Sequence, residues 1–406
     1  MFLTVSKRFE FSASHRLYLK RWSPQENREF FGRKSEGLYG HGHNYVAHFV
    51  FRGAVDEDSG MLINVTTIKE RILPLLEARY DHKYLNADTS PFNDILPTPE
   101  NVARELLKDA SELFTDQRAQ PVACHLIESP ASAATAYADG RVERDLHLDF
   151  SAARRTFSPH LTEEENQKLF GIASSFAGHG HHYRLRITLS GEIDAVHGMV
   201  SPDVEIQPVL DELHREFDHR NINTDVPGLQ GQPITTEILA RYMAGRLSAR
   251  LPFDRLRLHE NDNFFVEYGR SGEALTGLRQ SFTAAHRLHC TTMDDSENLQ
   301  LYGKCNNPYG HGHLYDVECS LAGTIDERTG TLGNLDGDNR ALAAVLADWD
   351  YKHLDRETPD FTDRPSTGEN MIWLLWDKLE KTIPHRLHRL RLWETRNNRF
   401  TLRRNE

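Results

Sequence analysis

Pairs of histidines separated by a single glycine occur three times in this chain, at residues 41–43, 179–181 and 311–313. In a β-strand, residues i and i+2 point to the same face, so both imidazoles of each pair project together. A further histidine precedes two of the pairs. Three nitrogen ligands with one open position are typical of catalytic rather than structural zinc. One pair alone would equally suit a polar strand face, but two complete sets at matching intervals predict two metal sites.

The predicted zinc ligands form two sets, which we call the first triad (His15, His41 and His43) and the third triad (His286, His311 and His313). The middle pair, His179 and His181, is preceded by Arg154 instead. A guanidinium group is positively charged and offers no lone pair to a metal. The sequence therefore predicts two zinc sites and a middle pair without metal.

A cysteine next to one triad is the predicted proton-transfer group. Six residues before the first histidine of each pair stand Ser35, Ala173 and Cys305, and only the last is a thiol. A nearby cation favours the thiolate, which is the reactive form. The chain has 4 cysteines, too few for a disulfide framework in 406 residues, so we expect a reducing, cytoplasmic setting.

Further motifs recur in the same order at almost equal intervals. They are FSASHR, FSAARR and FTAAHR; DHKYLN, DHRNIN and DYKHLD; PTPEN, PITTEI and PSTGEN (around Glu100, Glu237 and Glu369); and LIESP, LHEND and LWETR. A fixed order at a fixed interval indicates an internal repeat. We predict three tandem domains, at residues 1–141, 142–272 and 273–406.

Each repeat has the pattern of an α+β unit. Segments such as HNYVAHFVFRG alternate polar and apolar residues, as half-buried strands do. The glycine-containing turn after each of these, such as DEDSGML, predicts an antiparallel hairpin partner. Helices are predicted at 66–80 and 98–114 in the first repeat. The expected order is strand-strand, helix, helix, strand-strand, with two helices on an antiparallel sheet.

The composition excludes several classes of protein. The formal charge is −12, which argues against a general nucleic-acid or anionic-membrane surface. No run of 18 apolar residues is present, so no transmembrane helix is expected. Charged residues make up 27% and hydrophobic residues 38%, as in soluble globular proteins.

An ordered set of five motifs in this chain resembles the 6-pyruvoyl-tetrahydropterin synthase and 6-carboxy-tetrahydropterin synthase family. The motifs are FxAxHR, CNNPxGHGHxY, DHKxLN, PTxEN and a late ET, and the resemblance extends in triplicate over essentially the whole chain. The resemblance implies the tunnelling fold (T-fold), whose units associate as rings around a barrel. A single chain with three units would form a pseudo-trimeric barrel. The family holds one zinc with three histidines and converts 7,8-dihydroneopterin triphosphate.

The resemblance also implies roles for individual residues. Cys305 would act as the base, and an Asp-His pair would assist proton transfer. The pair is intact at Asp81/His82 and Asp218/His219, whereas the third repeat has Asp350 followed by Tyr351. The pterin anchor would be a glutamate that is present in every repeat, as Glu128, Glu260 and Glu394.

No repeat contains the triad, the cysteine and the Asp-His pair together, so we predict sites shared across repeat boundaries.

The expected activity is a zinc-dependent pterin lyase that eliminates triphosphate to give 6-pyruvoyl-tetrahydropterin, for tetrahydrobiopterin biosynthesis. Alternatives are side-chain cleavage of the 6-carboxy-tetrahydropterin synthase type, as in queuosine biosynthesis, and a non-catalytic pterin- or purine-binding protein. The first repeat, with Ser35, is a second candidate site of low activity and altered chemistry, such as aldol cleavage. A homodimer would form a pseudo-hexamer.

Overall fold

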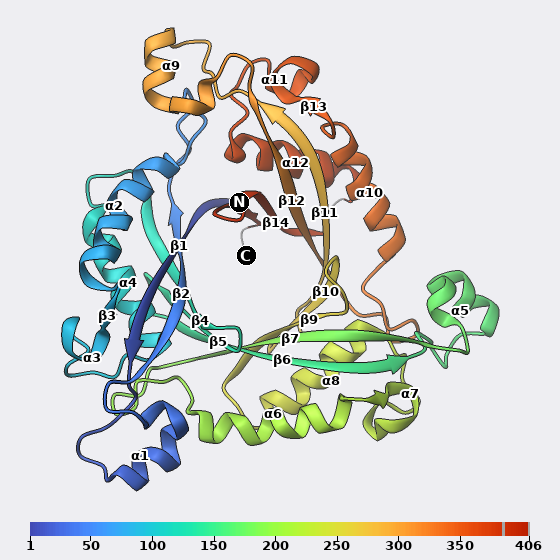
Figure 1. Ribbon diagram of the computed structural model, residues 1–406. Coiled ribbons are helices and arrows are strands. Elements are labelled where there is room, and N and C mark those ends of the chain that lie inside the picture. The colour runs from blue at the N-terminus through green and yellow to red at the C-terminus, as the bar shows by residue number, and fades with distance from the viewer. Residues whose placement is uncertain (384–385, 405–406) are drawn as a thin grey trace.

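The computed structural model describes residues 1–383 and 386–404, which form three similar units around one axis (Figure 1). The first unit contains β1 (Phe2–His15), α1 (Pro24–Phe31), the 3-10 segment η1 (Gly32–Ser35), β2 (His41–Arg52), α2 (Val65–Arg79), β3 (Lys83–Tyr84), α3 (Leu85–Asp88), α4 (Pro99–Leu113), β4 (Gln120–Ser129) and β5 (Ser132–Tyr137). The second contains β6 (Val142–Arg154), α5 (Glu163–Phe170), η2 (Gly171–Ser174), β7 (His179–Gly191), α6 (Asp203–Phe217), β8 (Arg220–Asn221), α7 (Ile222–Asp225), η3 (Pro227–Leu229), α8 (Thr236–Ser248), β9 (Phe253–His259) and β10 (Phe264–Gly269). The third contains β11 (Ala274–His286), α9 (Asp295–Tyr302), η4 (Gly303–Asn306), β12 (His311–Gly323), α10 (Leu335–Ala347), β13 (Lys352–His353), α11 (Leu354–Glu357), η5 (Pro359–Phe361), α12 (Gly368–Thr382), β14 (Leu387–Thr395) and β15 (Asn398–Arg403).

The long strands close into one antiparallel barrel. Each unit contributes four long strands, in the order β1-β2-β4-β5 for the first. The units are joined by the pairs β5–β6, β10–β11 and β15–β1, and the last pair brings the two ends of the barrel sheet together. The helices lie outside this barrel and the strands line its interior (Figure 1). The structure confirms the predicted α+β fold of three T-fold units in a pseudo-trimeric barrel.

The hydrophobic core lies between the outer face of the sheet and the helices. On β2, Tyr45, Ala47, Phe49 and Phe51 are fully buried, whereas the intervening residues face the barrel interior. Burial of each large apolar side chain stabilises the fold by about 1.5–3 kcal/mol. This alternation fixes the register, because a shift by one residue would turn every apolar side chain inward.

The predicted hairpin after each long strand is wrong. The glycine-containing turn leads into α2, α6 or α10, and β2 pairs instead with β1 and β4. The turn glycines have positive φ and contact the neighbouring repeat. Their carbonyls accept hydrogen bonds from threonine hydroxyls at helix N-termini: Gly198 from Thr98, Gly330 from Thr235 and Gly60 from Thr367. These turns therefore join successive repeats.

Three short helices, α1, α5 and α9, lie between the first two strands of each repeat, where no helix was predicted. Each has a complete capping box, for example Ser23 with Glu26 in α1. This motif is readable in the sequence. Each helix leads into a 3-10 segment close to the histidine pair. None of the described helices is long and apolar enough to cross a lipid bilayer.

Candidate active site

The first and third triads have the same geometry. His15 ends β1 directly opposite His41 at the start of β2, and His286 ends β11 opposite His311. The ring centroids of each of these pairs lie 4.6 Å apart. In both triads the three ligand nitrogens lie within 4.8 Å of one another. The strand pairing thus brings the histidines together as predicted.

The free nitrogens suit a metal ion. His15 Nδ1 donates to the Pro97 carbonyl at 2.7 Å and His286 Nδ1 donates to the Ser366 carbonyl at 3.0 Å, which leaves Nε2 free in each ring. His286 Nε2 and His311 Nε2 are 3.2 Å apart. Two nitrogens at tetrahedral positions around zinc, each about 2.0–2.1 Å from it, would be separated by roughly 3.3 Å. His43 Nε2 and His313 Nε2 are buried without a hydrogen-bond partner.

The triad imidazoles are in the form that binds metal. Burial lowers the pKa of His15 to about 3 and, with neighbouring histidines, that of His311 to about 4. Burial also lowers the pKa of His41 and His43. These rings are therefore neutral near pH 7, and neutral imidazole is the ligand form.

The second repeat contains an ion pair where the other two have a triad. Arg154 is buried, and its Nη2 donates to Glu260 Oε2 at 2.5 Å and to Thr236 Oγ1 at 3.0 Å. His181 Nε2 lies 3.2 Å from the other carboxylate oxygen of Glu260. Among the described residues, only the first and third repeats contain a group that could hold a metal.

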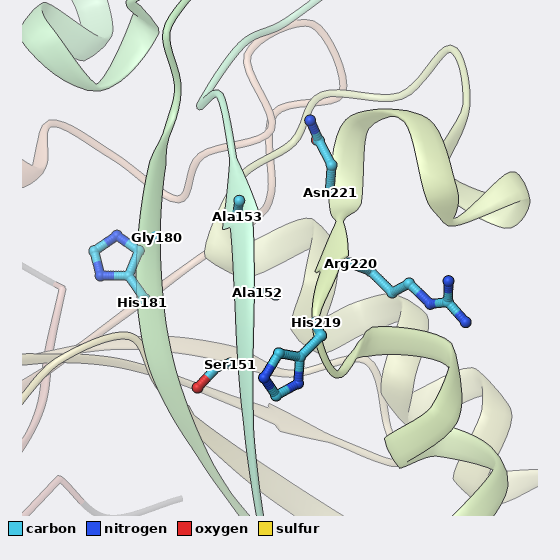
Figure 2. A pocket seen from close by; sticks show the side chains of 8 residues that line it. All are labelled: Ser151, Ala152, Ala153, Gly180, His181, His219, Arg220 and Asn221. Carbon is cyan, nitrogen blue, oxygen red and sulfur yellow. The ribbon is translucent and has the colours of Figure 1, made fainter.

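The predicted Asp-His pairs form, but they lie apart from the triads. Asp81 Oδ2 is 2.8 Å from His82 Nδ1 and Asp218 Oδ2 is 2.7 Å from His219 Nδ1. In the second repeat, a cavity of about 540 Å³ is lined by residues of β6, β7 and the β8 region (Figure 2). Figure 2 shows the His181 and His219 imidazoles on either side of β6.

Both histidines of these pairs are highly exposed, with 83% of the His82 side chain and 84% of the His219 side chain accessible. Tyr351, the equivalent in the third repeat, is 86% exposed, and Asp350 accepts a hydrogen bond from the Thr283 amide. Within residues 1–383 and 386–404, no contact links His82 or His219 to a triad. The sharing of a site between repeats therefore stays a prediction.

The glutamates predicted to anchor the pterin lie beside the histidine clusters. Glu128 Oε1 is 3.5 Å from His15 Nε2. Glu394 Oε1 is 3.8 Å from His286 Nε2 and 3.9 Å from His313 Nε2. In the second repeat, Glu260 already accepts hydrogen bonds from Arg154 and Thr236. Only Glu128 and Glu394 thus lack a cationic side chain as direct partner.

The structure corrects the residue that corresponds to Cys305 in the first repeat. The backbone carbonyl of Cys305 accepts from the Leu288 amide, and the equivalent bonds are Thr156 to Ala173 and Leu17 to Lys34, each 3.0 Å long. Lys34, rather than Ser35, therefore occupies the cysteine position. The connection from η1 to His41 is one residue longer than its equivalents, so counting back from the histidine gave the wrong residue.

Lys34 and Cys305 differ in what they contact. Lys34 Nζ donates to Asp203 Oδ2 of the second repeat at 2.9 Å. Cys305 is half-buried in η4, where burial and the Glu394 carboxylate raise its pKa, against the opposing charge of Lys304. This is opposite to the lowered pKa expected from the sequence, so thiolate formation would require a cation on the third triad.

Three further glutamates, noted in the sequence only as repeat landmarks, are buried at the repeat boundaries. Glu369 Oε1 accepts from the Leu62 amide of the first repeat at 2.9 Å, and burial raises its pKa to about 8. Glu100 and Glu237 accept from the amides of Val200 and Leu332 in the next repeat. Their threefold recurrence could have identified them as candidate ligand-binding residues.

Cationic side chains oppose two of these glutamates but not the third. Arg144 Nε lies 3.8 Å from Glu100, and burial raises the pKa of Glu237 against the opposing positive charge of Arg154. No cationic side chain pairs with Glu369 among the described residues. Only the third repeat thus combines a triad, a thiol and a buried carboxyl free of a positive partner.

A barrel of T-fold units with histidine triads at the repeat boundaries defines the structural class. The family profile of 6-pyruvoyl tetrahydropterin synthase matches residues 4–139, 145–271 and 277–405. The chain therefore belongs to the 6-pyruvoyl tetrahydropterin synthase family, in three tandem copies. This confirms the resemblance seen in the sequence and the prediction of an enzyme of this family.

Individual relatives each match about one repeat. The 6-pyruvoyl tetrahydrobiopterin synthase of Poecilia reticulata is 45% identical over 29% of this chain and 82% of its own length. That of Homo sapiens is 42% identical over 32% of this chain and 91% of its own length. The dihydroneopterin monophosphate aldolase of Pyrococcus furiosus is 36% identical over 22% of this chain and 75% of its own length.

Proposed function

We propose that the third repeat carries a zinc-dependent lyase site that converts 7,8-dihydroneopterin triphosphate into 6-pyruvoyl-tetrahydropterin with loss of triphosphate. The observation that supports this most directly is the combination of Cys305 with the third triad, because no other repeat has a thiol there. Zinc held by His286, His311 and His313 would supply Lewis-acid activation of the substrate side chain.

The chain's own residues have distinct roles in this proposal. The Cys305 thiolate accepts a proton from a side-chain carbon, and the electron pair of that bond moves into the ring C=N bond, which takes up a proton. The side chain is thereby oxidised and the ring reduced within one molecule, and triphosphate leaves with the electron pair of its carbon–oxygen bond. Glu394, beside the triad, binds the substrate. The buried Glu369 carboxyl is a second candidate for the heterocycle, because a protonated carboxyl offers both an O–H donor and an acceptor oxygen.

The exposed Asp-His pairs lead us to infer a second chain at the site. Tyr39, Phe176 and Tyr309, close before the three histidine pairs, are at least 80% exposed, as are the imidazoles of His82 and His219. In a homodimer stacked through these residues, Asp81/His82 or Asp218/His219 of one chain would complete the Cys305 site of the other. Asp350 is followed by Tyr351 instead of a histidine, so in this proposal its carboxylate only holds its own loop through the hydrogen bond from the Thr283 amide.

The test is incubation of zinc-loaded protein and a Cys305→Ala variant with 7,8-dihydroneopterin triphosphate, with products identified by mass spectrometry. A 6-pyruvoyl product that the variant fails to form supports the proposal. A 6-carboxy product would indicate the alternative branch. A product that persists in the variant would assign the chemistry to the first repeat, where side-chain cleavage of the aldolase type is the second candidate. Pterin binding without turnover would indicate a non-catalytic protein.

A further inference from the structure

The interior of the barrel carries an unbalanced group of positive charges. Strand alternation places these residues inside: Leu185 and Ile187 are buried in the outer core, so Arg186 between them faces inward. Phe400 and Leu402 are likewise in the core, so Arg399 and Arg403 face inward. These three arginines come from strands β7 and β15 of different repeats.

Most charges inside the barrel are paired. Arg257 Nη1 donates to Glu318 at 3.0 Å, Arg389 Nη2 to Glu267 at 2.8 Å and Arg391 Nη1 to Glu318 at 2.8 Å. These two carboxylates are thus already shared among three guanidinium groups, so they leave no spare negative charge for other arginines.

Arg186, Arg399 and Arg403 are the exception. In the part of the chain that the structure describes, none of their guanidinium groups has a hydrogen bond or an ion pair, and Arg399 Nε is buried without a partner. Burial and the charges of Arg403 and Arg186 lower the pKa of Arg399 to about 10, although Glu318 opposes this. The charges of Arg186 and Arg403 thus both act on Arg399 in the barrel interior.

Two histidines of the first repeat adjoin this group. His48 and His125 are direct cross-strand partners with ring centroids 6.0 Å apart, and Arg399 contributes to the lowered pKa of both rings. Asp145, beside His125, accepts a hydrogen bond from Thr188 at 2.6 Å and lies 4.0 Å from His125 Nδ1. Asp145, Glu267 and Glu318 act on the three arginines without forming an ion pair with any of them among the described residues.

One inward-facing position shows how the charge differs between the repeats. His48, Arg186 and Glu318 occupy the same position, seven residues after the first histidine of each pair. The side chain at this position is thus neutral in the first repeat, positively charged in the second and negatively charged in the third. A buried charge without a partner is costly, so such a group is normally compensated by a counter-charge.

We propose that the barrel interior binds a multiply charged oxyanion of the phosphate class, held by Arg186 and Arg399, with Arg403, His48 and His125 around it. Guanidinium groups bind phosphate oxygens in a bidentate manner, and several of them around one anion restore charge balance. This site is separate from the triads and does not depend on the proposed lyase activity.

The test is thermal unfolding of the full-length protein in inorganic phosphate and in chloride at matched ionic strength, with and without a metal chelator. We compare the Arg186→Gln/Arg399→Gln double variant with the Arg184→Gln control. Arg184 lies two residues away on the same strand and is paired with Asp262 at 2.6 Å. We expect saturable stabilisation by phosphate in wild type and in the control, with or without chelator.

The double variant should lose the phosphate effect and unfold in chloride at a temperature equal to or above that of wild type, because two inward-facing cations without an ion pair have been removed. The proposal is wrong if phosphate acts no better than chloride, if chelation abolishes its effect, or if the double variant keeps it. Should the double variant not fold, Arg399→Lys retains the charge without the bidentate group and should weaken phosphate binding at least fivefold; unchanged binding would equally overturn the proposal.

Discussion

The first and third repeats hold three histidines in the same geometry but surround them with different chemistry. The paired rings are 4.6 Å apart in both. The third repeat adds Cys305 and an unopposed Glu369, whereas the first has Lys34, bound to Asp203, and a Glu100 that faces Arg144. An ammonium group has no lone pair with which to accept a proton. The histidines and the residue at the Cys305 position therefore differ independently between the repeats, because different segments supply them.

The second repeat extends the comparison. Arg154 brings one positive charge to the place where a triad would hold a cation, and Glu260 pairs with it directly. The electrostatic role of a bound cation is thus retained by a side chain, while the chemistry of an open coordination position is lost.

The largest expected effect distinguishes the two triads. His286→Ala should lower turnover at least 100-fold and remove one zinc per chain, whereas His15→Ala should remove one zinc and change turnover less than threefold. Zinc analysis together with product formation measures both. His182→Ala, which alters an exposed histidine beside the second pair, is the control. Equal loss of turnover in both triad variants would show that the repeats do not differ as described.

The next prediction transfers the thiol. In a Cys305→Ala background, Lys34→Cys should restore turnover to at least tenfold above the background rate, because it places a thiol at the equivalent position beside an intact triad. Ser35→Cys in the same background is the matched control and should restore nothing, since the Ser35 hydroxyl is directed to the Gly32 carbonyl at 2.8 Å. Rescue by Ser35→Cys instead would contradict the assignment of Lys34.

A third prediction rebuilds the missing triad. Arg154→His should raise the zinc content from two to three per chain, because His179 and His181 are already in place opposite β6. Zinc content by elemental analysis is the measurement, and Arg155→His, one residue away and facing Glu163, is the control. A content of two in the Arg154 variant would mean that the pair is no longer competent to bind metal.

The smallest expected effect concerns stability. Burial raises the pKa of Glu369 in the folded state to about 8, above its pKa in the unfolded chain. Between these two pKa values the folded state binds one proton more than the unfolded state, so the free energy of unfolding falls as the pH rises through this range. Glu369→Gln, which mimics the protonated form, should therefore stabilise the protein by at least about 1 kcal/mol more at pH 9 than at pH 5, given about 1.4 kcal/mol per pKa unit. Denaturant unfolding at both pH values measures this difference. An equal effect at both would show that Glu369 is ionised throughout.

Much of the fold could be read from the sequence because the repeats provide three versions of each motif. The strands that carry the histidine pairs and the helices at 66–80 and 98–114 appear within a residue or so of the expected positions, as α2 and α4 for the helices. The hairpin was wrong because a glycine turn with positive φ has the same sequence appearance whether it joins two strands or docks on a neighbouring repeat.

The site was only partly predictable for a similar reason. The triads depend on strand periodicity and on β1–β2 register, both of which follow from local sequence. Lys34 was missed because an added residue before His41 shifts the count, and only the backbone hydrogen bond to Leu17 shows the true equivalence.

The sequence by itself determined that three related units exist, that two of them have three histidines that could hold a metal and that one has a thiol six residues before its histidine pair, because these properties follow from residue types and intervals. Tertiary structure alone decided which groups are compensated. It placed Arg144 against Glu100 and Arg154 against Glu260, left Glu369 without a cationic partner among the described residues, and turned Arg186 and Arg399 towards the barrel interior without an ion pair. Charge balance depends on distances between residues far apart in the chain, and closure of the barrel sets those distances.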